Sequence, residues 1–176
     1  YQKAEQGRPV PEGALWPHPP AVKPFQLEAS DGGYVDLDRL QGRWTFVFFG
    51  FTYCPDICPT TLAALARVTE KLRAADADSN VQILFVSVDP KRDTLERLRS
   101  YVEFFDPEFI GARAKLVQLA GLTEQFGIVH FRGTPSDDGD YTVDHSASIV
   151  LIDPDLRRVG VLGAPHDVDN VVSKYR

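Results

Sequence analysis

Two long apolar runs stand out in the pattern of hydrophobic and polar positions. Residues 44–51 are mostly aromatic or β-branched, with no alternation between apolar and polar positions, and residues 81–88 are similarly apolar. A run of this kind is typical of a strand that is covered on both faces. We therefore predict two central strands in these positions.

Helical spacing of apolar residues follows each of these runs. The expected helices span residues 59–75, 94–105, 115–126 and about 167–174. Pro59 is well placed as the first residue of its helix, because the missing N–H is not needed there. Asp93 with Glu96 three residues later predicts a capping box at the start of the next helix.

Shorter patterns complete the expected fold. Two short strands around a glycine turn predict a hairpin at residues 25–37, and further strands are expected at 128–131, 146–152 and 159–162. The order strand, helix, strand, helix, then a hairpin and a last helix is typical of a thioredoxin-like α/β domain. We predict a central mixed sheet flanked by helices, with an N-terminal β-hairpin extension.

Proline spacing divides the chain into two parts. Residues 1–24 contain six prolines, which remove backbone donors and favour an extended arm or tether. Residues 25–176 are expected to form one domain. The chain begins at Tyr1 and contains no methionine, so we expect a processed or truncated form without its native amino terminus, and a removed signal or membrane anchor is one interpretation.

Composition narrows the classes of function. The 176 residues are 43% apolar, enough for one substantial core, and the formal charge is −6. No dense run of basic residues occurs, which disfavours binding to nucleic acid. No apolar stretch approaches the roughly 20 residues needed to cross a bilayer.

The chemistry of the chain centres on Cys54 and Cys58, its two cysteines. They are four positions apart at a strand-to-helix junction, so one helical turn can bring both thiols to one face. If Cys58 is the N-cap residue, the helix dipole is expected to lower its pKa. Paired thiolates favour Cu(I) or zinc, whereas an iron–sulfur cluster usually needs four cysteines. A stabilising disulfide is the alternative, although so short a loop gains little from closure.

Three sequence blocks resemble the Sco (SenC) copper-chaperone family. These blocks are Phe49–Pro59, Val86–Thr94 and Val143–Ser146, which occur in the order expected for that family. The resemblance covers about residues 23 to 174. It implies a thioredoxin fold and one bound copper ion, Cu(I) or Cu(II), with Cys54, Cys58 and His145 as ligands.

The resemblance also implies a function and a location. We expect a metallochaperone, not an enzyme in the usual sense, that delivers copper to the binuclear copper centre of cytochrome c oxidase subunit two. Other periplasmic copper chaperones are further expected partners. The expected location is the periplasm or an equivalent envelope side, with the native form anchored to the inner membrane.

Alternatives remain for the same residues. A thiol–disulfide oxidoreductase that reduces the copper-ligand cysteines of subunit two needs Cys54 and Cys58 but not His145. A peroxiredoxin-like peroxidase is compatible with the fold but has no argued peroxide pocket. Tyr53 departs from the His or Asn often found there in the family, and it is expected to tune the edge of the site. Asp93 is interpreted either as a helix cap or, together with Asp89, as part of a partner-facing loop.

Overall fold

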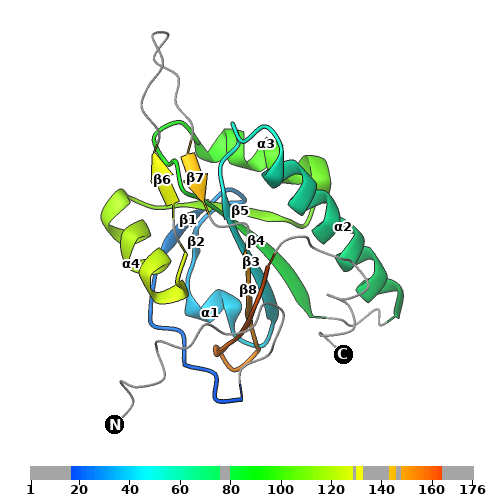
Figure 1. Cartoon of the computed structure of the whole chain (residues 1–176). Coiled ribbons are helices and arrows are strands. Elements are labelled where there is room, and N and C mark those ends of the chain that lie inside the picture. Colours follow the sequence, from blue (N-terminus) through cyan, green and yellow to red (C-terminus); the bar gives the residue numbers. More distant parts are fainter. Residues whose placement is uncertain (1–16, 76–79, 129, 133–142, 146–147, 164–176) are drawn as a thin grey trace, which may run out of the picture.

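The computed structural model describes residues 17–75, 80–128, 130–132, 143–145 and 148–163, with backbone only for 130–132 and 143–145. A seven-stranded mixed sheet lies at its centre, in the order β2-β1-β5-β4-β3-β8-β9 (Figure 1). Its strands are β1 (Leu27–Ala29), β2 (Tyr34–Val35), β3 (Trp44–Gly50), β4 (Val81–Ser87), β5 (Ile110–Arg113), β8 (Ile149–Ile152) and β9 (Arg158–Leu162). The helices are α1 (Leu37–Leu40), α2 (Ile57–Ala75), α3 (Leu95–Phe105) and α4 (Leu116–Phe126). A separate ribbon pairs β6 (His130–Arg132) with β7 (Val143–His145).

The two predicted central strands are confirmed and lie side by side. Strand β3 pairs in parallel with β4, from Trp44 opposite Val81 to Gly50 opposite Ser87, and β4 pairs in parallel with β5. All but the first residue of β3 and of β4 are buried. The carboxyl ends of these strands therefore meet at one edge of the sheet, where the chain leaves β3 for the cysteines.

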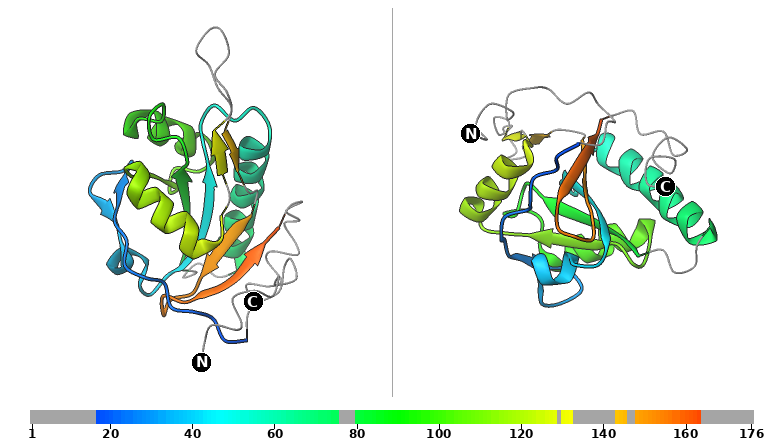
Figure 2. Two further views of the ribbon diagram at one scale, coloured as in Figure 1. Left: turned by 60° about the vertical axis from the view of Figure 1, so that its left-hand side comes forward. Right: turned by 90° about the horizontal axis from the view of Figure 1, so that it is seen from below.

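Helices cover both faces of the central strands. On one face, Phe85 of β4 packs against Tyr101 of α3. On the other face, Phe49 of β3 makes an edge-on contact with Phe126 of α4. Figure 2 shows α4 separated from α2 and α3 by the sheet. Together with the β1–β2 hairpin, this arrangement confirms the predicted thioredoxin-like α/β class.

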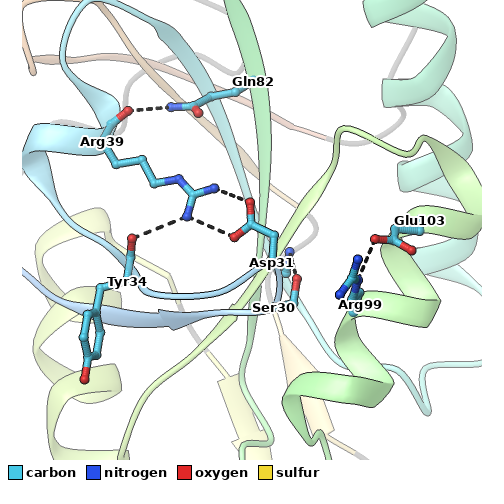
Figure 3. Close-up of polar contacts among 8 residues, drawn as sticks. Ser30, Asp31, Tyr34, Arg39, Gln82, Arg99 and Glu103 are labelled. Atoms are coloured by element: carbon cyan, nitrogen blue, oxygen red, sulfur yellow. Dashed lines mark hydrogen bonds and ion pairs between the residues drawn. The ribbon is translucent and has the colours of Figure 1, made fainter.

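A network of polar contacts ties the N-terminal hairpin to the sheet. Arg39 of α1 forms an ion pair with Asp31 in the β1–β2 turn, and its side chain also reaches the Tyr34 carbonyl (Figure 3). Gln82 of β4 donates to the backbone oxygen of Arg39 at 3.5 Å. These polar contacts add to the burial of Leu27, Val35 and Leu40, which makes the hairpin and α1 part of the core.

The residues just before β1 bond to the rest of the domain, and Val22 is part of its buried core. The Val22 amide donates to the Leu156 carbonyl at 2.8 Å, and the Lys23 amide donates to Gln125 of α4 at 3.0 Å. Residues 1–16 and the predicted helix at 167–174 lie outside the described residues. Within the described part of the chain, no helix is both long enough and apolar enough to span a membrane.

Candidate metal centre

The two cysteines lie where β3 ends and α2 begins. Cys54 is on the connecting loop and is 8% exposed, and Cys58 is in the first turn of α2 and is 0% exposed. The helix begins at Ile57, so Cys58 is within it, and the prediction of Cys58 as the N-cap is wrong. Asp56 and Pro59 both allow the helix to begin near them, and sequence alone rarely fixes such a boundary to the residue.

The thiols are close enough to interact directly. A side-chain hydrogen bond joins Cys54 and Cys58, and no disulfide joins them. This hydrogen bond, followed by burial, raises the pKa of Cys58, while a hydrogen bond from the Phe51 backbone acts in the opposite direction. The expected lowering of the Cys58 pKa is therefore wrong for the metal-free protein, because the neighbouring thiol and desolvation outweigh the helix terminus.

Close packing fixes Cys58 against the sheet. A Cβ built on Gly50 would lie 2.7 Å from Cys58 Sγ and 2.7 Å from Cε2 of Phe85. Gly50 has no positive φ, so the requirement for glycine here is one of space. Gly50, the last residue of β3, thus leaves room for the Cys58 sulfur. The apolar pattern of β3 alone does not reveal this close approach.

The buried carboxylate of Asp93 holds the loop that leads to Cys54. Asp93, 0% exposed, accepts hydrogen bonds from the Thr52 hydroxyl at 2.6 Å and the Thr52 amide at 3.1 Å. It also accepts from the Ser87 hydroxyl at 2.7 Å. The loop before Cys54 is therefore tied to the end of β4.

This role of Asp93 was missed in the sequence, where it was interpreted as a helix cap or as part of a partner-facing loop. The cap of α3 is Thr94, whose side chain accepts from the Arg97 amide. Asp89, the other residue of the expected partner-facing loop, is also buried, and it pairs with Arg92 at 2.5 Å. A signal was present: Asp89 directly follows the apolar run at 81–88 and Asp93 comes four residues later, and aspartates in these positions are as consistent with burial as with capping.

Two arginines enclose the ring of Tyr53. The guanidinium carbon of Arg97 lies 4.0 Å from the ring centroid and that of Arg92 lies 4.6 Å from it. Arg97 Nε also donates to the Thr52 hydroxyl at 2.5 Å. Tyr53 is 45% exposed, so the stack lies at the surface beside Cys54, in agreement with the expectation that Tyr53 is at the edge of the site.

The third predicted ligand is on the β6–β7 ribbon. In backbone register, His145 is opposite His130. Figures 1 and 2 place this ribbon at the same end of the sheet as the cysteine loop. The side chain of His145 is outside the described part of the structure, so its role as a ligand stays a prediction. Among the described side chains, no group of three His, Cys, Asp or Glu residues is arranged to hold a metal ion.

The donor set still fits a soft metal. Two sulfur atoms from one strand-to-helix junction match the ligands that Cu(I) prefers, and the surrounding core excludes water from Cys58. Asp93, a described carboxylate of this region, is already engaged by Thr52 and Ser87, so its oxygens are not free to act as hard ligands. The described part of the site favours a thiophilic cation over magnesium or calcium.

Comparison with known proteins agrees with this chemistry. Protein SCO1 homolog 1, mitochondrial, of Arabidopsis thaliana is 37% identical over 148 residues, covering 84% of this chain and 44% of that protein. The chain thus spans less than half of that relative's length. A putative copper-binding protein of Stutzerimonas stutzeri is 34% identical over 157 residues, covering 89% of this chain and 76% of that protein.

A solved structure and a family model agree with the proposed chemistry of this site as well. The crystal structure of Arabidopsis thaliana ScoI with copper bound superposes with a TM-score of 0.81 at 35% identity, covering 87% of this chain and 94% of that one. The family model described as SCO1/SenC matches residues 16–176. The suspected resemblance is confirmed: this chain belongs to the SCO1/SenC family.

Proposed function

We propose that this chain binds one copper ion through Cys54, Cys58 and His145 and acts as a copper metallochaperone. The observation that carries the proposal is the hydrogen-bonded Cys54–Cys58 pair at the β3–α2 junction. Copper-binding relatives share this family, and an Arabidopsis relative has been solved with copper bound. When bound, copper would be held as Cu(I) by the two thiolates, and an imidazole would add the ligand that Cu(II) prefers.

The proposed recipient is the binuclear copper centre of cytochrome c oxidase subunit two. Support comes from the family resemblance, together with a site whose ligands can be exchanged one at a time. Cys54 is on a loop near the surface, so it can leave the metal while Cys58 keeps hold of it. A partner thiol can then replace Cys54, which is the chemistry that metal transfer between thiolate sites requires.

The proposed setting is the periplasm or an equivalent envelope side, with the native form anchored to the inner membrane. Other periplasmic copper chaperones are the proposed metal donors. The proline-rich arm supports a tether, because prolines keep a chain extended. Fractionation of the native full-length protein, with and without alkaline extraction of the membranes, tests the anchor.

A reductase that acts on the subunit-two cysteines is the second candidate, and the proximity of the two thiols favours it. Dithiol exchange begins with attack by a thiolate. The raised pKa of Cys58 keeps that thiol protonated at neutral pH, so Cys54, the more exposed of the two, would have to begin the exchange. The same protonation predicts that Cu(I) binding releases protons and that its apparent affinity increases as the pH rises.

Anaerobic titration with Cu(I), in competition with bicinchoninate, tests the proposal, followed by titration with Cu(II). We expect one equivalent of copper to bind. His145→Ala should lose the visible thiolate-to-Cu(II) bands and weaken copper retention, whereas His18→Ala, an exposed histidine on the arm, should not. If copper is lost to a weak competitor while the thiols cycle readily in a glutathione buffer, the reductase replaces the chaperone as the better account.

A further inference from the structure

Arg97 of α3 is held beside Cys54 with part of its guanidinium unused. Its guanidinium carbon lies 4.0 Å from the centroid of the Tyr53 ring, and its Nε donates to the Thr52 hydroxyl at 2.5 Å. Arg97 forms no further hydrogen bond or ion pair with the described residues, so its terminal Nη1 and Nη2 groups remain available as donors. Tyr53 directly precedes Cys54, which places these donors at the edge of the proposed copper site.

The position of Arg97 is restricted before any partner arrives. An arginine on a protein surface usually loses rotamer freedom when it forms an ion pair, which is one reason why such pairs contribute little. The ring stack and the hydrogen bond to Thr52 already restrict Arg97, so less freedom is lost on binding. A planar guanidinium with free terminal N–H groups suits a carboxylate, because the carboxylate accepts two parallel hydrogen bonds.

A second cation, Lys91, lies in the loop before α3. Lys91 is exposed and forms no ion pair with a described residue. It directly precedes Arg92, whose guanidinium carbon lies 4.6 Å from the centroid of the Tyr53 ring. The two aspartates of the same loop, Asp89 and Asp93, are buried and already engaged. They therefore leave the charge of Lys91 unpaired by the loop itself.

The charge of this edge differs from that of the whole chain. The formal charge of the chain is −6, so its long-range field repels an acidic partner. The exposed carboxylates nearest in sequence, Asp56 and Glu96, form no ion pair with Arg97 or Lys91. An acidic partner that is preferred in spite of the net charge must therefore be recognised by local cations.

We propose that Arg97 and Lys91 form a docking point for aspartate or glutamate side chains that flank the copper-accepting thiol of a partner protein. In an extended chain, residues one or two positions from that thiol lie within about 7 Å of it. Carboxylates at these positions would hold the thiol beside Cys54, the ligand that we propose leaves the metal first. This inference rests on the proposed copper-binding function and names the charge of the partner.

The transfer itself is an exchange of ligands on Cu(I), whose oxidation state does not change. The partner thiol loses its proton to solvent as its sulfur binds the metal, and the released Cys54 sulfur takes up a proton. Docking through Arg97 and Lys91 changes how often the partner thiol is in place, and it does not change the ligand chemistry.

The first test uses the reduced, copper-free protein and two capped peptides, Glu-Glu-Ser-Glu-Glu and Gln-Gln-Ser-Gln-Gln. Binding is followed by the NMR signals of the Tyr53 amide and the Arg97 Nε–H. We expect the acidic peptide to bind about three-fold more tightly or better, as for a well-placed surface ion pair. This preference should disappear in 1 M salt, where charges more than about 3 Å apart are screened.

The second test measures Cu(I) transfer by stopped flow to the same peptides with cysteine in place of serine. The ratio of the two transfer rates is compared between variants, so a change in intrinsic copper release cancels. Arg97→Ala should remove most of the acidic preference, and Lys91→Ala should reduce it by a smaller factor. Arg99→Ala is the matched control, because it removes the same charge from α3 at an exposed residue that pairs with Glu103 (Figure 3), and it should keep the preference.

The outcomes separate this inference from the copper site. If both peptides bind and accept copper equally well, or if the neutral peptide is preferred, the docking point is overturned and the copper site stands. An equal loss of preference in Arg97→Ala and Arg99→Ala would show that net charge decides, which also overturns it. Failure of the unmodified protein to bind Cu(I) would remove the proposed function, and this inference with it, whatever the copper-free protein binds.

Discussion

The two cysteines of this site are held by different kinds of interaction. Cys58 lies in the first turn of α2, fully buried against Gly50 and Phe85. Cys54 lies on a loop, and the residues before it are held by hydrogen bonds and stacked charges. Close packing leaves little freedom of position, whereas a loop that is held by a few hydrogen bonds can open locally. One proposed copper ligand is thus fixed by the core, and the other is adjustable.

The strongest test of this comparison concerns the close packing around Cys58. In Gly50→Ala, the added methyl group would lie 2.7 Å from Cys58 Sγ and from Phe85, so the sulfur or the ring must move. We expect a loss of about 3 kcal/mol in the free energy of unfolding, at the upper end of the usual cost of overpacking. Urea denaturation measures this loss, and Cu(I) competition should show that copper binding is impaired as well.

Gly121→Ala is the matched control for that substitution. A Cβ at Gly121 in α4 would meet nothing within 4 Å. Alanine is favoured over glycine inside a helix, so this variant should gain about 0.5–1 kcal/mol. If both alanine variants keep native stability and copper affinity, Cys58 is not fixed by packing against β3, and the contrast between the two cysteines fails.

The next test concerns the hydrogen bonds of Asp93 that hold the loop before Cys54. Asp93→Ala removes the carboxylate that accepts from the Thr52 amide, the Thr52 hydroxyl and the Ser87 hydroxyl. We expect the free energy of unfolding to fall by about 2 kcal/mol, because hydrogen bonds to a charged group are lost and a buried amide is left unpaired. Copper should also dissociate faster in stopped-flow transfer to bicinchoninate, since the loop carrying Cys54 is released.

Asp38→Ala controls for the loss of an aspartate, because Asp38 is exposed in the first turn of α1. Its effect on stability should be within about 0.5 kcal/mol. Equal copper dissociation rates for Asp93→Ala and the unmodified protein would show that the loop is held by something other than this network.

The sequence predicted the strands that pack around Cys58 better than the hydrogen bonds that hold the loop before Cys54. Long apolar runs can hardly be anything but central strands, and β3 and β4 were predicted to within about one residue. The short β5 strand and α1 helix were missed, because four residues give too little periodicity to recognise. The hydrophobic pattern alone thus predicted the main strands and helices of the fold but not its shorter elements.

The polar contacts depended on tertiary structure. Asp93 and Glu96 fit a local capping box, yet Asp93 bonds to Thr52, 41 positions earlier, and Thr94 caps the helix instead. The raised pKa of Cys58 likewise reflects its thiol neighbour and burial, neither of which the helix-terminus argument included. Contacts between distant segments decide such roles, and local motifs do not encode them.

The smallest expected effect concerns the stack beside Cys54. Arg97→Ala removes one of the two cations from the Tyr53 ring and the hydrogen bond to the Thr52 hydroxyl, while Arg92 remains on the ring. Because both contacts are partly exposed, we expect about 1 kcal/mol of lost stability and a modest increase in copper dissociation. Arg99→Ala on the same helix removes only a solvent-exposed ion pair with Glu103, so it should change stability little and leave copper dissociation unchanged. If the two variants release copper at the same rate, the stack does not hold the loop, and Asp93 alone accounts for the position of Cys54.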